Sequence, residues 1–267
     1  MNERNGFAVV RRPMSSVERT APGARRVLAG MVVETLALAE EKALITHSPK
    51  ASALLQSWCQ KGEDYYDGQG VPQNYVEAAK WFRMAAEKGH ARAQSWLGSL
   101  FEGGNGVAQN FDEAIAWYRK SAEQGDIYGQ YCLGECYLNG IGVTEHYTES
   151  AKWFRKAAEQ GDAWSQYHLG SFYEGGDGVP QDYVESVRWY QMAAKNNFEN
   201  AMFRLSSLFL NGDGVEQDLV EAYKWLKLAT EENAFWEKKL NSLRSSLTKE
   251  QIAEAEKRYR EFQSSKK

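Results

Sequence analysis

The hydrophobic and polar residues of this chain follow the period of an α-helix, and short glycine-rich segments separate the helical stretches. Within residues 90–125 the pattern predicts two helices, because two sets of apolar residues recur at spacings of three and four. Gly103 and Gly104 should end the first helix, since glycine accepts the left-handed conformation common at helix C-termini. Asn110, with Glu113 three residues later, has the spacing of a capping box that opens the second helix. The two apolar sets are Ala93, Leu97, Leu100 and Phe101, and Ala114, Trp117, Tyr118 and Ala122.

This two-helix unit is repeated five times with a period of 36 residues. Two short amphipathic helices cannot bury their apolar faces alone, whereas stacked copies can, so a fixed period of this length is typical of a repeat array. We predict an all-α solenoid of about five helix-turn-helix repeats without β-strands, and we expect the recurring tryptophans to lie in its core. The period is marked by Trp81, Trp117, Trp153, Trp189 and Trp225, and by Gly70, Gly106, Gly142, Gly178 and Gly214.

The helix caps recur with the same period, although the third copy departs from the rule. It places His146 before Glu149, and histidine is a weaker cap than asparagine or aspartate. The regular pairs are Asn74/Glu77, Asn110/Glu113, Asp182/Glu185 and Asp218/Glu221.

The repeated motif resembles the Sel-1-like repeat, a relative of the tetratricopeptide repeat. The motif reads A-x-A-Q-x-x-L-G-x-x-Y/F-x-x-G-x-G-V-x-Q-D/N-Y/F-x-E-A-x-x-W-Y/F-x-x-A-A-E-x-G and is matched closely by residues 91–125. The resemblance implies a right-handed α-solenoid that serves as a protein-interaction scaffold or adaptor. It also implies that the first helix of each copy lines a concave groove.

The pattern divides the chain into four segments. Residues 1–23 are polar and contain two prolines, so we expect a basic arm without stable structure. Residues 24–53 should form an amphipathic helix and a linker, and residues 54–233 the five repeats. Residues 234–267 should form a decayed sixth repeat and a charged C-terminal capping helix. A charged cap is expected here because the terminal repeat of an array needs a polar outer face.

Charge and composition limit the remaining possibilities. The formal net charge is −4, which argues against wholesale nucleic-acid binding, yet residues 1–26 hold six arginines and only two glutamates. Nucleic-acid contact through this arm is therefore one alternative function. The sequence contains no uncharged apolar run long enough to predict a membrane-spanning helix. Its three cysteines, an odd number, predict no disulfide framework and fit a reducing compartment. We expect a cytoplasmic protein, or an exported one if residues 1–39 act as an atypical signal.

The five copies can be compared with one another, and positions that vary between copies are free for recognition. The residues at 92, 95, 96, 99 and 102 and their equivalents lie on one face of the first helices, opposite the constant Leu-Gly pair. Aromatic residues, arginine and histidine collect there, and such side chains are frequent at binding hot spots. The alternative is that these aromatic residues pack between neighbouring helices. The predicted partner-binding residues are Arg92, Trp96, Tyr128, Tyr131, Trp164, Tyr167, His168, Phe203 and Arg204.

Other chemistry has weaker support in the sequence. Cys132, Cys136 and His168 supply only three metal ligands where structural zinc needs four, and Cys136 has the phase of a core residue. We predict no metal, no cofactor and no catalytic residues, and hence a non-enzymatic protein that binds a protein or peptide partner. An enzyme, or an enzyme-regulating subunit with a site in the groove, is the other alternative.

Overall fold

The computed structural model describes residues 48–265, except for the side chain of Glu232. The chain divides into two compact units, residues 1–54 and residues 55–267, and helices α3 to α13 lie in the second unit. The predicted arm at residues 1–23, and residues 24–47 of the predicted helix and linker, lie outside the described residues.

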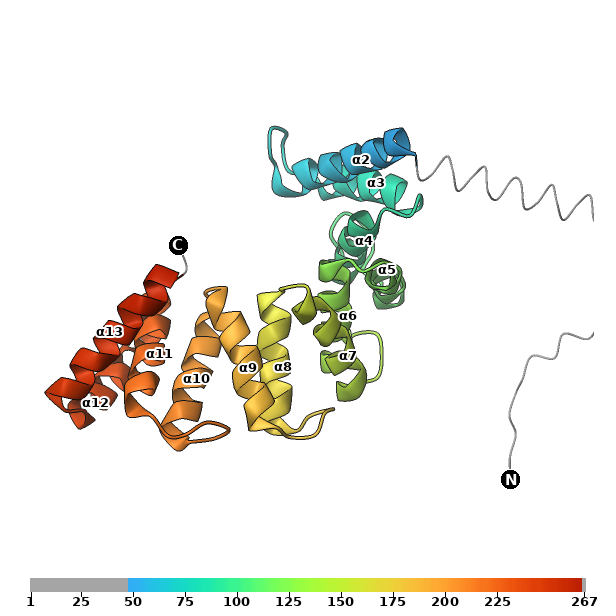
Figure 1. Cartoon of the computed structure of the whole chain (residues 1–267). Helices are drawn as coiled ribbons and strands as arrows, with labels where there is room; N and C mark the ends of the chain where they lie inside the picture. Colours follow the sequence, from blue (N-terminus) through green and yellow to red (C-terminus); the bar gives the residue numbers. More distant parts are fainter. Residues whose placement is uncertain (1–47, 266–267) are drawn as a thin grey trace, which may run out of the picture. The chain divides into compact units, whose positions relative to one another are not determined.

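Residues 48–265 contain twelve α-helices, one short 3-10 helix and no β-strand, as the periodicity predicts (Figure 1). Helices α2 to α11 alternate as the first and second helices of copies 1 to 5. None of these helices combines the length and the apolar character needed to cross a membrane. The elements are α2 (Pro49–Asp67), α3 (Tyr75–Ala86), α4 (Ala91–Gly103), α5 (Phe111–Glu123), α6 (Ile127–Asn139), α7 (Tyr147–Glu159), α8 (Ala163–Gly175), α9 (Tyr183–Lys195), α10 (Glu199–Asn211), α11 (Leu219–Glu232), η1 (Ala234–Trp236), α12 (Glu237–Ser246) and α13 (Lys249–Ser265).

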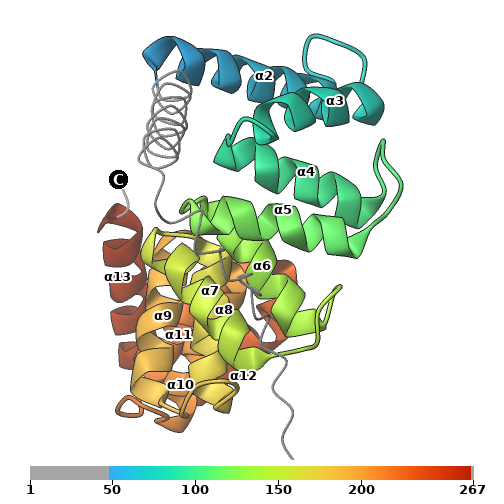
Figure 2. The ribbon, with the colours of Figure 1, turned by 90° about the vertical axis from the view of Figure 1, so that its right-hand side faces the viewer.

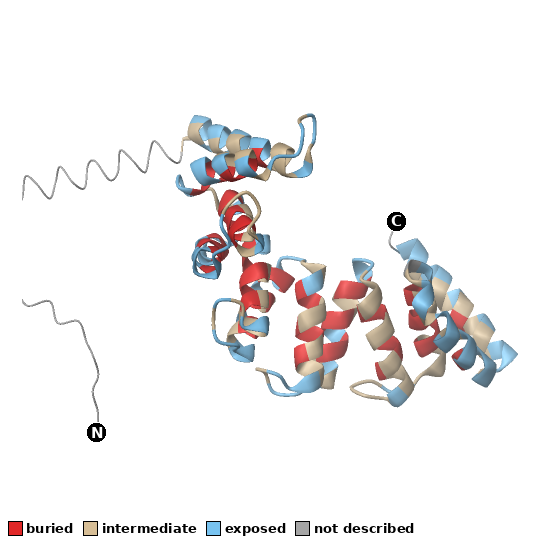
Figure 3. Ribbon diagram, turned by 180° about the vertical axis from the view of Figure 1, so that it is seen from behind, coloured by how far each residue is buried: buried red, intermediate tan, exposed pale blue. Residues whose placement is uncertain are grey.

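In copies 2 to 5 each second helix packs against the first helix of its own copy, and in copies 1 to 4 it packs against the first helix of the next copy (Figure 2). The buried residues lie on the faces where these helices meet (Figure 3). At the end of the array α13 packs against α11. The leucine shared by the first helices of copies 2 to 5, and one large side chain in each second helix of copies 1 to 4, are almost completely buried: Leu97, Leu133, Leu169 and Leu205, and Phe82, Tyr118, Phe154 and Tyr190.

The predicted caps open the second helices. The side chains of Asn74, Asn110, Asp182 and Asp218 each accept a hydrogen bond from the backbone N–H three residues later. In the third copy His146 caps through Nδ1 at a longer distance of 3.3 Å. Local hydrogen bonding therefore fixes where each second helix begins.

The capping-box prediction is wrong in one respect for the repeats: the glutamate side chain is not the partner of the backbone N–H of the capping residue. The backbone N–H of Asn110 donates to the carbonyl of Phe101 in the first helix at 2.9 Å, so Glu113 is not needed to satisfy it. The other four copies make the equivalent backbone bond. A reciprocal capping box forms instead at the start of α13, where Thr248 N donates to Gln251 Oε1 at 2.9 Å and Gln251 N to Thr248 Oγ1 at 3.2 Å.

Glutamine side chains link successive copies through the interior. Gln94 Nε2 donates to the carbonyl of Ala86 at 3.0 Å, and Gln124 Nε2 donates to Gln94 Oε1 at 2.7 Å. The same two bonds recur 36 residues later, and again with Asn196 in place of the second glutamine. The motif glutamine thus satisfies the C-terminal carbonyls of the preceding second helix, which water cannot reach.

The tryptophan series is only partly in the core. Trp117, Trp189 and Trp225 are buried, as predicted, whereas Trp81 and Trp153 are half-buried. The ammonium groups of Lys61 and Lys156 lie over the rings of Trp81 and Trp153 respectively. A tryptophan at a fixed repeat position therefore differs in burial from copy to copy.

Candidate functional site

The nine predicted binding residues project from α4, α6, α8 and α10, and we call them the first-helix face. Arg92 and the residues at the equivalent position of copies 3 and 4, Tyr128 and Trp164, are exposed. Tyr128 has 40% of its surface accessible and Trp164 has 54%. The remaining six are half-buried: Trp96, Tyr131, Tyr167, His168, Phe203 and Arg204.

Three half-buried aromatic residues of the first-helix face occupy equivalent positions in copies 3 to 5. The rings of Tyr131 and Tyr167 each lie against an aromatic ring of the second helix of the same copy, and the ring of Phe203 lies against one in η1. These residues therefore help to hold the helices together, and truncating them would remove packing as well as surface. The pairs and the distances between their ring centroids are Tyr131 and Phe154 at 6.0 Å, Tyr167 and Tyr190 at 5.7 Å, and Phe203 and Trp236 at 3.7 Å.

Trp96 and His168 stand 72 residues apart and make the same two contacts with the preceding copy. Each ring stacks on a buried phenylalanine, and each places a ring nitrogen beside a glutamate of that copy's first helix. Trp96 stacks on Phe82 with an interplanar angle of 7°, and its Nε1 donates to Glu63 Oε1 at 3.0 Å. His168 stacks on Phe154 with an angle of 4°, and its Nε2 lies 3.2 Å from Glu135 Oε1.

The two arginines of the first-helix face also pair with glutamates of the preceding copy. Arg92 Nε lies 2.7 Å from Glu63 Oε1. Arg204 places Nε at 3.1 Å and Nη2 at 2.9 Å from Glu174 Oε2, which also accepts the Tyr190 hydroxyl at 2.8 Å. Both pairs join consecutive first helices, so these arginines already have a structural partner.

The glutamates of the first helices reveal a second, longer period. They occupy one position in copies 1 and 3 and another position in copies 2 and 4, so the pattern repeats every 72 residues. The residues are Glu63 and Glu135 at the first position, and Glu102 and Glu174 at the second.

Among the residues that the structure describes, only Glu63 and Glu174 form an ion pair with an arginine. By the 72-residue period, Trp164 replaces Arg92 beside Glu135, and Cys132 replaces Arg204 beside Glu102. Between residues 48 and 265 no lysine or arginine forms an ion pair with Glu102 or Glu135, and the Tyr118 hydroxyl donates to Glu102 Oε2 at 2.6 Å.

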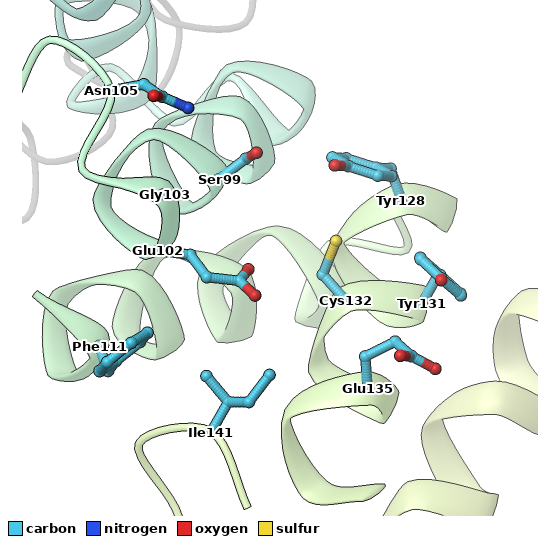
Figure 4. A pocket seen from close by; sticks show the side chains of 10 residues that line it. All are labelled: Ser99, Glu102, Gly103, Asn105, Phe111, Tyr128, Tyr131, Cys132, Glu135 and Ile141. Atoms are coloured by element: carbon cyan, nitrogen blue, oxygen red, sulfur yellow. The ribbon is translucent and has the colours of Figure 1, made fainter. Parts of the chain in front are cut away.

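Both of these glutamates line a cavity of about 480 Å³ between α4 and α6. Its other walls include Ser99, Tyr128 and Tyr131. Figure 4 shows Glu102 extending from α4 toward Cys132 on α6. A second cavity of about 470 Å³ lies on the other side of Tyr128 and is lined by Arg92, Trp96, Asp126, Ile127 and Asp162.

Burial shifts the pKa of three groups at this site. The pKa of the Glu135 carboxyl is raised by burial, a hydrogen bond from Asn139 opposes the shift, and the charge of Glu102 adds to it. Burial lowers the pKa of His168 to about 4, so its imidazole is neutral at pH 7 and gives Glu135 no positive charge. Burial also raises the pKa of the Cys132 thiol, which makes it a poor nucleophile.

The sequence pattern placed positions 99 and 102 on this face, but it did not single out the glutamates there as candidate binding residues. Copies were compared at a spacing of 36 residues, at which Glu102 aligns with Leu138 and Glu135 aligns with Ser99 and Ser171. At 72 residues Glu102 aligns with Glu174, and Glu135 with Glu63. Comparison of alternate copies would have shown both pairs.

The motif and the fold agree with comparisons to known proteins. A family model described as the Sel1 repeat matches residues 62–90, 91–126, 127–162, 165–198 and 200–233. No protein with a curated description matches the sequence.

Two solved structures are similar in both sequence and fold. The first is c5321, described as a protective antigen of uropathogenic Escherichia coli strains displaying an SLR fold. It is 32% identical, with a TM-score of 0.70 over 80% of this chain and 46% of that chain, so this chain spans about half of its length. The second is a Sel1 repeat protein from Oxalobacter formigenes, which is 32% identical with a TM-score of 0.63, covering 75% and 81% of the two chains. With five matched repeats and these relatives, the chain belongs to the Sel1 repeat family and folds as an α-solenoid.

Proposed function

We propose that this protein is a non-enzymatic interaction module that binds a peptide segment of a partner protein on the first helices of copies 2 and 3. The family supports this proposal, because Sel1 repeats are commonly protein-interaction scaffolds. The observation that carries it is the pair of cavities on either side of Tyr128. Each is within the range of roughly 300–1,000 Å³ typical of ligand sites.

Tyr128 is the central contact of the proposed site. Its ring lies 5.7 Å from that of Trp96 and 6.4 Å from that of Tyr131, so three aromatic rings form one continuous apolar surface. An extended segment that crosses Tyr128 can place one side chain in each cavity. A few large anchors of this kind usually supply most of the affinity of an interface.

The other residues of the first-helix face have a different part in the proposal. Tyr167, His168, Phe203 and Arg204 position the helices through their packing and ion-pair contacts. Trp164, with more than half of its surface exposed, extends the binding surface toward copy 4.

The test begins with selection of peptides from a displayed library on the purified full-length chain. Dissociation constants are then measured for the wild type, for Tyr128→Ala and for Tyr147→Ala. Tyr147 is a matched control because it also has 40% of its surface exposed but lies on a second helix. Tyr128→Ala should weaken binding by about 2 kcal/mol or more, the size of a hot spot. Tyr147→Ala should leave the dissociation constant unchanged.

Two results would contradict the proposal. If no peptide is selected, the chain does not bind peptide segments. If selected peptides bind Tyr128→Ala as tightly as the wild type, the binding surface lies elsewhere. Circular dichroism of both variants must show the wild-type helix content, because Tyr128 also contacts Trp96.

A further inference from the structure

We propose that the cavity between α4 and α6 selects an arginine side chain of the bound segment, with Glu102 as the carboxylate that pairs with it. The inference rests on the proposed peptide-binding function and specifies the chemistry of the partner. It is carried by a comparison of copies 2 and 3 with copies 4 and 5 of the same chain.

The structure contains an internal example of this recognition. Glu174 Oε2 accepts the hydroxyl of Tyr190 from its own copy and two guanidinium nitrogens of Arg204 from the next copy. The three side chains come from α8, α9 and α10. An arginine thus completes a glutamate–tyrosine pair where two copies meet.

Seventy-two residues earlier the same pair lacks its arginine. Tyr118 donates to Glu102 Oε2 at 2.6 Å, just as Tyr190 donates to Glu174 Oε2. The position of Arg204 is held by Cys132, whose side chain is short and carries no positive charge. The cavity of about 480 Å³ includes Cys132 and Glu102 in its walls. A guanidinium group that a partner places in this cavity would meet Glu102, the counterpart of the carboxylate that pairs with Arg204.

The other walls of the cavity also suit a cation. The rings of Tyr128 and Tyr131 lie 24° from parallel, and a guanidinium group stacks favourably on tyrosine faces. Glu135 adds a second carboxylate, whose neighbour His168 is held neutral by burial. Because Tyr118 already fixes Glu102, the planar fork of arginine should fit better than the compact ammonium group of lysine.

The experiment measures the binding of the full-length chain to four nonapeptide libraries immobilised on a membrane. Each library has randomised flanks and one fixed central residue: arginine, lysine, norleucine or citrulline. Citrulline has nearly the shape of arginine but carries no charge. At about 0.15 M salt, at least about tenfold more wild-type protein should bind to the arginine library than to the citrulline library. More should also bind to the arginine library than to the lysine library. A factor of ten corresponds to about 1.4 kcal/mol.

Three variants locate this preference. Glu102→Gln should remove it, whereas the matched Glu174→Gln should retain it, because Arg204 already occupies the equivalent site. Cys132→Arg should also remove it and should raise the melting temperature, since it supplies the missing guanidinium from within the chain. If Cys132→Arg does not fold, the comparison of Glu102→Gln with Glu174→Gln decides the matter.

The outcomes separate the two proposals. Equal binding of the arginine and citrulline libraries by the wild type would overturn the arginine preference and leave peptide binding intact. An arginine preference that persists in Glu102→Gln would overturn the assignment to this cavity. Failure of the wild type to bind any of the four libraries would overturn peptide binding itself.

Discussion

Replacing Gly134 with alanine tests how closely the two helices of a copy approach each other. A Cβ atom at Gly134 would lie 2.8 Å from two ring carbons of Phe154, whereas ordinary carbon–carbon contacts are about 3.5–4.0 Å. The ring is completely buried and stacks on His168 at 4.6 Å, so it cannot retreat freely. Overpacking of this kind costs about 1–3 kcal/mol, while the higher helix propensity of alanine returns up to about 1 kcal/mol. We therefore expect Gly134→Ala to lower the free energy of unfolding by about 1–2 kcal/mol.

The chain itself suggests how to relieve this clash. Four copies combine glycine in the first helix with an aromatic residue in the second, and copy 5 combines Ser206 with Leu226. Phe154→Leu alone should cost about 1–1.5 kcal/mol, because it removes the ring that stacks on His168. In the double variant the leucine leaves room for the new methyl group. The combined loss should be smaller than the sum of the single losses by about 1 kcal/mol.

The assay is urea unfolding followed by circular dichroism, with amide hydrogen exchange in α6 and α7 to register local opening of the array. Ser206→Ala is the control, because copy 5 already carries a Cβ atom at this buried position and alanine adds no atom that could clash, so it should lower stability less than Gly134→Ala does. Two results would refute the reasoning: Gly134→Ala more stable than the wild type, or single losses that add within about 0.3 kcal/mol.

Three further predictions concern turns, pH and capping. A Cβ at Gly106 would lie 2.3 Å from backbone atoms of Tyr75, whereas one at Gly70 would meet nothing within 4 Å, and both glycines have φ near +70°. Gly106→Ala should therefore lower the melting temperature more than Gly70→Ala, in which the backbone strain of about 1–2 kcal/mol acts alone. The folded-state pKa of His168 is lowered to about 4, so its contribution is complete above its unfolded pKa of about 6.5 and is lost as pH falls toward 4. From pH 7 to pH 5 the free energy of unfolding should fall by about 2 kcal/mol more in the wild type than in His168→Gln, and equal falls would contradict this. His146→Asn should stabilise the protein by about 0.5–1 kcal/mol in urea unfolding, and no gain would show that the histidine cap is already adequate.

The helices and their ends could be predicted because their causes are local. Asn110 caps α5 and the left-handed Gly104 ends α4, and both residues act within one turn of the backbone. The predicted hydrogen bond from the Asn110 N–H to the Glu113 side chain was wrong because of tertiary packing. The first helix of the same copy places the carbonyl of Phe101 2.9 Å from the Asn110 nitrogen. The capping box of Thr248 formed at the start of α13, where the cap N–H bonds the Gln251 side chain.

Burial at equivalent positions could not be predicted from the repeat alone. Trp153 and Trp189 occupy the same position of the motif, yet only Trp189 is buried. The depth of a side chain depends on what the neighbouring copies place against it, and these neighbours alternate. A comparison at 36 residues also did not single out Glu102 and Glu135, because each aligns with a different residue type in the next copy and with a glutamate two copies away.

The alternation gives the variable positions of this array two distinct uses. At the junction of copies 4 and 5 the varied residue Arg204 pairs with Glu174, so variation there strengthens the stack. At the junction of copies 2 and 3 the varied residue is Cys132, and within residues 48–265 no lysine or arginine pairs with Glu102 beside the cavity. A carboxylate held in place by Tyr118 gains most from a partner that brings the missing charge, because its geometry is fixed before binding. If the proposal is right, variation between copies has turned a stacking contact into a recognition site without changing the residues that hold the helices together.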